Sequence, residues 1–256
     1  AETEGANIEG IIFEELKNEV SSNAKKLQKK SNFPGENFSG ANASGKNFSE
    51  SNLSGADFSN SNLNNSSMSE VDFSYADLTN ADLSDSDLLG ANLVGADLEG
   101  ANLSNANLSG ADLSGTNLKN ANLKNSKLFG TKLFGTILEG ADLSFSQIEG
   151  SNFSGSIMQN VILTEVNLSG GFFEGVNLSD VKLNDRNLSK IKFHNAILKD
   201  ADLTNSDLSN TDLSNAYLNS ATLTNANLQN ANLFSTDLGN ADLTNVDFSG
   251  ADLRQV

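Results

Sequence analysis

Large apolar residues recur at every fifth position along most of the chain. In blocks of five counted from Ser31, the third residue is Leu, Phe, Met or Ile from Phe33 to Leu253, except at Ala43, which gives 45 consecutive blocks without an insertion. The first residue of a block is mostly small, the second mostly Asp or Asn, the fourth often Ser or Thr, and the fifth mostly Gly or Asn. A period of five fits neither an α-helix nor an ordinary strand.

Strand geometry explains the order of residues within a block. Side chains of extended chain alternate between two faces, so the first and third residues point one way and the second and fourth point the other. Gly and Asn tolerate the positive φ of a corner at the fifth position. Each block is therefore predicted to be a very short strand followed by a corner, and successive blocks to wind into a coil with its apolar side inward.

A weaker period of 20 residues indicates how many blocks form one coil. Five phenylalanines lie at multiples of 20 from one another: Phe33, Phe73, Phe153, Phe173 and Phe193. Four blocks per coil fit this spacing, and the repeat then makes about 11 coils, a rod on the order of 54 Å long at the spacing of paired strands. We therefore expect an all-β, four-sided β-helix over residues 31–256.

The N-terminal segment, residues 1–30, breaks the five-residue pattern. Its apolar residues recur at three-to-four spacing, which predicts an amphipathic capping α-helix over about 11–30, with a start within 8–15. An open solenoid end is an unpaired strand edge, and a helix can cover it. A helix lying on a membrane surface is the alternative role for this segment.

Tandem blocks of the form A(D/N)LxG resemble the pentapeptide-repeat proteins. Examples are ADLEG at 96–100, ADLSG at 111–115 and ADLTN at 241–245, and the resemblance extends over residues 31–255. It implies a right-handed, quadrilateral β-helix. It implies less about activity, because the family includes gyrase-protecting quinolone-resistance proteins that resemble DNA in shape and charge, together with many proteins of unassigned role.

Charge and composition restrict the partners of such a rod. The formal net charge of −17 disfavours direct binding to nucleic acid or to an anionic membrane, because phosphates would be repelled. No apolar run approaches the roughly 20 residues of a membrane-spanning helix, so no membrane insertion is expected. The chain begins with Ala1, which leaves the compartment open: cytoplasmic, or periplasmic, lumenal or secreted if Ala1 is the end left by signal cleavage.

Catalytic and metal-binding chemistry is not indicated by the sequence. The chain has no cysteine, and its one histidine, His194, falls at an outward fourth position without an evident nucleophile or ligand cluster. The acidic run Asp82, Asp85 and Asp87 lacks the spacing of a calcium loop. We expect no enzyme activity, no cofactor and no metal site.

Outward positions between about 126 and 200 change from Asp, Asn and Ser to larger apolar or basic residues. Three of them, Ile137, Ile157 and Ile197, occupy second positions at multiples of 20. Together with Tyr217 further along they should align in one row, with Asn177 completing it. A partner surface is one interpretation, and packing between neighbouring coils is the other. The candidate interaction residues are Phe129, Phe134, Ile137, Ile157, Phe172, Ile197 and Tyr217.

Two further features break the regular pattern. Arg186 occupies an inward first position, where an unpaired guanidinium would be costly, so we expect a backbone bulge that turns it out toward Asp185 or Asp200. The last blocks keep perfect register without a cap, so Leu243, Phe248 and Leu253 are the candidate contacts of a homodimer formed by the final coils of two chains.

These observations favour a non-enzymatic rigid scaffold that presents an acidic surface to an unidentified protein partner. One alternative is a DNA mimic that binds DNA gyrase or another DNA-binding protein. A remote alternative is an ice- or mineral-facing surface, suggested by the short ladder Thr204, Thr224 and Thr244.

Overall fold

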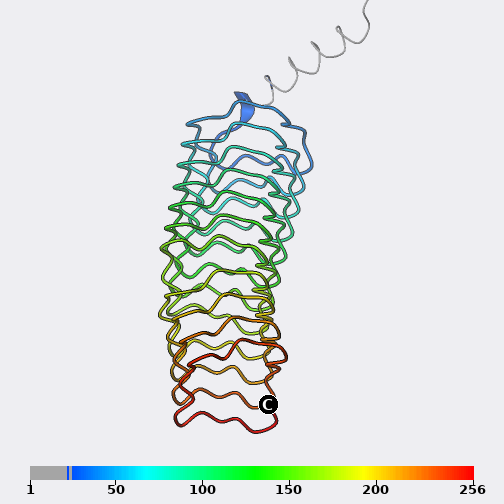
Figure 1. The fold of residues 1–256 in the computed structure, drawn as a ribbon. Coiled ribbons are helices and arrows are strands. Elements are labelled where there is room, and N and C mark those ends of the chain that lie inside the picture. Colours follow the sequence, from blue (N-terminus) through cyan, green and yellow to red (C-terminus); the bar gives the residue numbers. More distant parts are fainter. Residues whose placement is uncertain (1–21, 23–24) are drawn as a thin grey trace, which may run out of the picture.

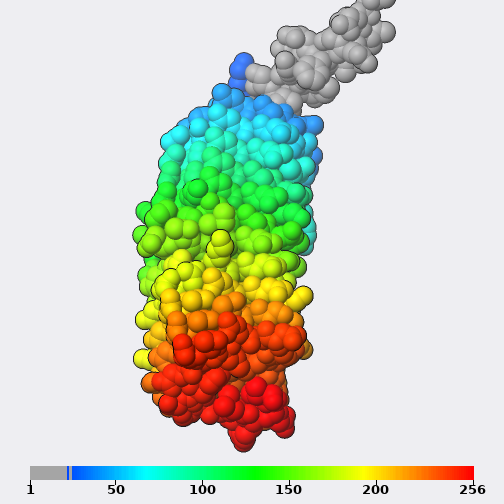
Figure 2. Space-filling view, viewed as in Figure 1, coloured from blue at the N-terminus to red at the C-terminus, as the bar shows by residue number. Residues whose placement is uncertain are grey.

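The chain winds into a stack of similar coils that forms a rod (Figure 1), and the space-filling view shows the coils in close contact along its length (Figure 2). The computed structural model describes residue 22 and residues 25–256. Helical conformation is found at Ser22 and at Lys25 and Lys26, and the rest of the described chain consists of isolated bridges and turns. No helix in the described part of the chain is long and apolar enough to cross a membrane.

Neighbouring coils are held together by parallel bridges between residues 20 apart. The bridged residue is the second of each block, as in Asn32 with Asn52 and Asn92 with Asp112. Four consecutive blocks each provide one bridge, so one coil has four sides. The sequence predicts very short strands, and the structure reduces each of them to a single bridged residue.

Each block is joined to the next coil by a repeating set of main-chain hydrogen bonds. The amide of Leu113 donates to the carbonyl of Lys132 at 2.8 Å, the amide of Gly115 to Phe134 at 2.9 Å, and the amide of Lys132 to Ala111 at 3.0 Å. Three bonds per block therefore replace the continuous ladder of a longer strand.

The core is the axis of the rod, as the inside-outside pattern predicts. First and third residues are buried along most of the repeat, with exceptions that include Glu36, Arg186 and the last coil, and most of the leucines at third positions are fully buried. Aromatic rings stack coil upon coil: Phe38 and Phe58 have ring centroids 4.7 Å apart, and Phe153 and Phe173 have centroids 5.3 Å apart with an interplanar angle of 3°. Burial of one such side chain contributes roughly 1.5–3 kcal/mol.

The corners lie at the fourth and fifth positions of each block. The fifth residue has positive φ, 60° at Asn105 and 67° at Gly110 for example, and the next amide closes the turn by donating to the carbonyl three residues earlier. The second residue stabilises the same turn: the amide of Ser104 donates to Oδ1 of Asn102 at 3.2 Å. Asp and Asn at second positions therefore accept a hydrogen bond that the turn requires, as in an Asx-turn.

The predicted N-terminal helix lies largely outside the described residues. Its described part is helical up to Lys26 and not beyond, so the predicted end at residue 30 is wrong. Leu27 is buried and belongs to the core cluster, and the amide of Lys30 donates to the carbonyl of Ser49 at 2.9 Å. The helical conformation thus ends at Lys26, and the chain is hydrogen-bonded to the first coil by Lys30. Capping by the helix stays a prediction.

At the opposite end, the core becomes accessible over the last coil. Leu243 and Leu253 are 36% and 46% exposed, whereas Leu238 and Phe248 are partly buried. No further coil covers this side of them in the described chain.

Candidate interaction surface

The predicted row of apolar residues is confirmed as one aligned ladder. Parallel bridges join Ile137 to Ile157, Ile157 to Asn177, Asn177 to Ile197 and Ile197 to Tyr217. We call these five residues the apolar column. The same ladder begins with Asn37, includes Asp57, Asp77, Asp97 and Asn117 before the column, and continues after Tyr217 with Asp237. Acidic residues therefore lie on both sides of the column.

Members of the apolar column differ in how far they reach into solvent. Ile157 and Tyr217 are 40% and 52% exposed, whereas Ile137 and Ile197 are half-buried. Side chains on one ladder contact their neighbours in the adjacent coils, which covers part of each isoleucine. Ile157 and Tyr217 are therefore the members most available to a partner.

Two of the three candidate phenylalanines lie beside the apolar column. Phe172 is exposed on the side of the rod that precedes the column in each coil, and Phe134 is exposed at the corner between these two sides. A Cβ atom at Gly155 would lie 3.8 Å from the ring of Phe134, so this ring extends over the next coil. Phe129 lies two blocks before Ile137, on the opposite side of the rod, and does not join the column.

Several lysines near the column neutralise acidic groups of the adjacent coil. Lys132 Nζ lies 3.0 Å from Asp112 Oδ2, and Lys119 Nζ lies 3.1 Å from Glu139 Oε2. Partial burial tends to raise the pKa of Asp112, but hydrogen bonds from Ser114 and Lys132 outweigh it and hold the pKa below its usual value. The middle of the rod is consequently less acidic than the stretch 201–252, which carries seven Asp and no Lys or Arg.

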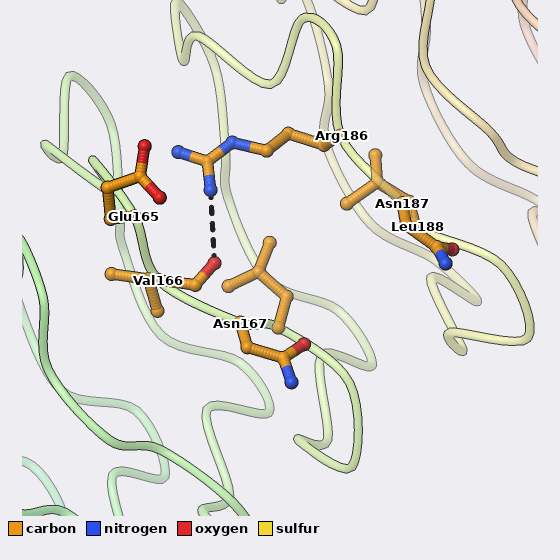
Figure 3. Close-up of a pocket in the computed structure, with 7 residues that line it drawn as sticks. Glu165, Val166, Asn167, Arg186, Asn187 and Leu188 are labelled. Carbon is orange, nitrogen blue, oxygen red and sulfur yellow. Dashed lines mark hydrogen bonds between the residues drawn. The ribbon is translucent and has the colours of Figure 1, made fainter.

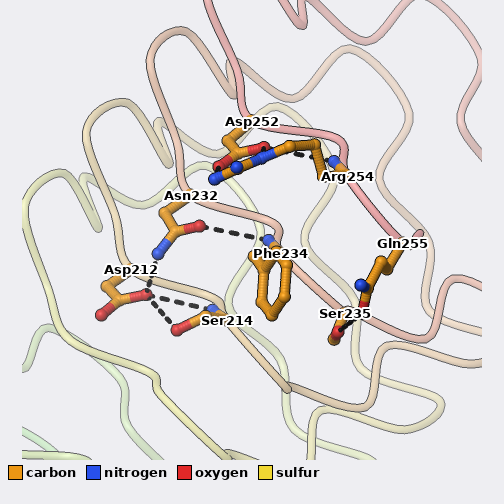
Figure 4. A network of polar contacts seen from close by, with 8 residues as sticks. All are labelled: Asp212, Ser214, Asn232, Phe234, Ser235, Asp252, Arg254 and Gln255. Carbon is orange, nitrogen blue, oxygen red and sulfur yellow. Dashed lines mark hydrogen bonds and ion pairs between the residues drawn. The ribbon is translucent and has the colours of Figure 1, made fainter.

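His194 contacts a polar network at a corner of the last coils. Figure 4 shows the part of this network that extends from Asp212 and Ser214 to Gln255. Nδ1 of His194 lies 2.8 Å from Oγ of Ser214, which donates to Oδ1 of Asp212 at 2.6 Å. The carboxylate thus engages the serine and leaves the imidazole without the partner that orients a catalytic base. No cluster of three or more metal-ligating side chains occurs among the described residues.

The same corner continues to the end of the chain. The guanidinium of Arg254 lies 5.6 Å from the ring centroid of Phe234 and pairs with Asp252, with Nη2 2.7 Å from Oδ2. These contacts tie the last coil to its neighbour and give the network a structural role.

Arg186 does not turn out toward Asp185 or Asp200, and that prediction is wrong. Its side chain is half-buried and extends toward the preceding coil, where Nη1 donates to the carbonyl of Val166 at 3.1 Å (Figure 3). Nη2 donates to the carbonyl of Leu163 at 2.6 Å. The two carbonyls accept hydrogen bonds from both terminal nitrogens of the inward-directed guanidinium. A cleft of about 240 Å³ adjoins it, lined by Glu165, Val166 and Asn187 among others. The sequence signals this site through Arg186 at an inward position but does not predict the cleft.

Comparison with protein families identifies the repeat. The profile of pentapeptide repeats matches the chain in 8 copies. The chain belongs to the pentapeptide-repeat family. Membership implies the right-handed β-helix that the resemblance predicts. The matched ranges are 37–69, 66–105, 101–140, 141–180, 187–225, 196–233 and 223–256, which leaves 1–36 and 181–186 unmatched.

Solved structures of other pentapeptide-repeat proteins resemble the chain. HetL from the cyanobacterium Nostoc sp. strain PCC 7120, involved in regulation of heterocyst differentiation, is 27% identical over 91% of this chain and 94% of its own, with a TM-score of 0.35. QnrB1, a plasmid-mediated fluoroquinolone resistance protein, is 18% identical over 86% and 90%, with a TM-score of 0.35. Rfr23 from the cyanobacterium Cyanothece 51142 is 37% identical over 37% and 58%, with a TM-score of 0.19. Comparison with curated proteins finds no match.

Proposed function

We propose that this pentapeptide-repeat protein is a non-enzymatic scaffold that binds a protein partner through the apolar column and the adjacent Phe134 and Phe172. The observation that carries the proposal is the alignment of Ile137, Ile157, Ile197 and Tyr217 on one ladder, with acidic residues on both sides of them. Second positions elsewhere are mostly Asp or Asn, which the turn uses. Apolar residues there forgo that acceptor, and contiguous apolar surface with aromatic anchors is typical of protein interfaces.

The test compares partner capture by the native chain and by the double variant Ile157→Asn, Tyr217→Asn. Asparagine at both positions restores the usual residue of the repeat, so folding should be preserved. We expect the partner's affinity to fall at least about tenfold, because interface anchors contribute about 1.4 kcal/mol or more. Leu89→Ser is the matched control, because Leu89 is exposed at a fourth position outside the column. Equal loss in the control, or none in the double variant, contradicts the proposal.

A DNA-mimic role is the second candidate, and the acidic part of the same ladder before the column favours it. Asp57, Asp77 and Asp97 are stacked on three successive coils, and the chain carries a net charge of −17. A regular row of carboxylates on a rod can replace the phosphates that a DNA-binding protein contacts. A gyrase supercoiling assay tests this role: inhibition or protection that is lost in the triple Asp→Asn variant supports it, and no effect of the native chain contradicts it.

The ice- or mineral-facing alternative is the weakest. Thr224 Oγ1 donates to Asp242 Oδ2 at 3.0 Å and Thr244 Oγ1 to Asp242 Oδ1 at 2.6 Å. These hydroxyls are engaged by a carboxylate and do not form a free threonine array. An ice-recrystallisation assay should therefore show no activity.

A further inference from the structure

Main-chain pairing between coils is interrupted at one region of the rod. No main-chain hydrogen bond joins the blocks 161–165 and 166–170 to the blocks 181–185 and 186–190 that follow one coil later, all of them within the described chain. On the column side, pairing is retained in both directions: Met158 donates to Asn177 at 2.7 Å and Leu178 to Ile197 at 2.7 Å. Within the described chain, the side formed by 171–175 and 191–195 keeps only the bond from the amide of Gly175 to the carbonyl of His194, at 2.8 Å. The two coils are therefore unpaired on two sides and weakly paired on a third, while the column side holds them together.

The side chain of Arg186 accounts for this separation. Elsewhere, several hydroxyl residues at first positions donate to the carbonyl 23 residues earlier, as Thr116 does to Leu93 at 2.8 Å and Thr131 to Leu108 at 2.9 Å. Arg186 donates to Leu163, which is also 23 residues earlier. A guanidinium is larger than a hydroxyl and stands further from its Cα, so the same bond is compatible only with coils that are further apart.

The separation opens a groove beside the guanidinium. The groove has a volume of about 740 Å³ and lies between 160–165 on one coil and 180–186 on the next. Its two edges carry main-chain groups that lack main-chain partners, among them the amides of Leu163, Glu165 and Lys182. In regular coils the corresponding groups form the ladder.

We propose that this groove is a binding site for an extended peptide segment of a partner protein, which inserts between the two coils and completes the interrupted ladders. Two facing edges of unpaired amides and carbonyls are complemented by a backbone that offers donors and acceptors at strand spacing. The carboxylates of Glu165, Asp180 and Asp185 outnumber the cations of Lys182 and Arg186 along the groove. The preferred segment is thus neutral or weakly basic.

The groove lies on the side of the rod that follows the apolar column in each coil. It meets the column side at the corner residues Asn160 and Asp180, but none of the column residues lines it. The paired column side provides the connection about which the coils can open further to admit a strand. If the column does not bind a partner, the groove proposal is unaffected. If the groove does not bind a peptide, the proposal for the column is likewise unaffected.

The probe is a synthetic ten-residue peptide with the sequence of residues 101–110, ANLSNANLSG, which is uncharged when its ends are blocked. The matched control peptide carries proline in place of both leucines, which removes two amide donors and both apolar side chains. Binding is measured by fluorescence anisotropy of labelled peptide, and its location by amide hydrogen exchange of the full chain. We expect saturable binding of the first peptide, at least about tenfold weaker binding of the control, and slower exchange at Leu163, Glu165 and Lys182.

Arg186→Thr provides the matched protein variant. Threonine should make the bond seen at Thr116, close the coils and protect the same amides without peptide, so peptide binding should be lost while thermal stability is kept or raised. Absence of saturable binding to the native chain overturns the proposal, as does equal binding of the proline peptide. Protection confined to residues 238–253 would place the peptide on the last coil and also overturn it.

Discussion

At the scale of single residues, register within the block determines each environment more strongly than residue type does. Tyr75 and Phe145 occupy fifth positions and adopt φ of 57° and 62°, although neither residue favours this region. Ala43 and Leu113 are fully buried at third positions despite their different sizes. The hydrogen bonds between coils therefore impose a positive φ on residues that do not favour it.

The inside-outside assignment predicts unequal effects for neighbouring residues. Leu113→Asp should lower the free energy of unfolding by several kcal/mol, because it places a charge in the fully buried axis. Asp112→Asn should cost less than about 1 kcal/mol, because Asn keeps the acceptor for the Ser114 amide and loses only an exposed ion pair. Urea unfolding followed by circular dichroism measures both, and comparable losses would contradict the assignment.

Positive φ at fifth positions predicts a stabilising substitution. Phe145→Asn should raise the free energy of unfolding by about 1 kcal/mol, because Asn tolerates this conformation better than Phe, which is 53% exposed here and loses little packing. Phe129→Asn is the control, since Phe129 is also exposed but lies at a fourth position without positive φ. Thermal melts compare the two, and a gain in both variants or in neither would argue against a backbone origin.

At the scale of elements, the corner and the ladder form one hydrogen-bonded unit. The second residue accepts from the amide two residues later and also pairs along the rod, as when Nδ2 of Asn102 donates to Oδ1 of Asp82 at 3.0 Å and Oδ1 of Asn102 accepts from Ser104. Side-chain ladders of this kind link successive corners. They explain why either Asn or Asp can occupy a second position without changing the coil.

Carboxylates in these ladders should make stability depend on pH. The pKa of Asp112 is lowered in the folded chain from its ordinary value of 3.8, so its contribution is present above about that pH and is lost as the pH falls through the folded-state value. Lys132 is mostly exposed, so the contribution is below about 1 kcal/mol. The stability difference between the native chain and Asp112→Asn should therefore shrink between about pH 7 and about pH 3 in urea titrations. A difference that stays constant would rule out the ionised pair as its source.

At the scale of the whole molecule, the two ends of the described rod differ. Leu27 covers part of the first coil, whereas the last coil leaves Leu243 and Leu253 exposed. Exposed core at the end of a solenoid is suited to association, and we propose a homodimer in which the final coils of two chains meet. Hydrogen bonds from Thr244 and Ser249 lower the pKa values of Asp242 and Asp247, so these carboxylates are charged and oppose the contact.

The dimer should therefore strengthen with added salt, which screens like charges across the contact. Sedimentation at several salt concentrations measures the association of the chain, and Phe248→Lys should weaken it at each one, because a charge would replace a partly buried ring. Asp57→Asn changes the net charge by the same amount, +1, far from the last coil and should leave association unchanged. A monomer at every salt concentration and at tens of micromolar protein would contradict the dimer.

The sequence by itself determined the coil. Inward and outward positions, corners at fifth residues and alignment of Ile137, Ile157, Ile197 and Tyr217 all follow from a pattern that repeats every five and every 20 residues. The pattern is sufficient because every block makes the same contacts with the block one coil away. Because each block repeats the same local geometry in register, the path of the whole coil is largely determined.

Tertiary structure decided the features that depend on one particular neighbour. Arg186 was recognisable as an exception, but its carbonyl partners, Leu163 and Val166, belong to the preceding coil and make no pattern with it in the sequence. The groove beside Arg186 lies where the main-chain hydrogen bonds between these two coils are missing. Half-burial of Ile137 and Ile197 likewise depends on the side chains stacked next to them. Such features arise from the reach of individual side chains across the coil spacing, which periodicity does not encode.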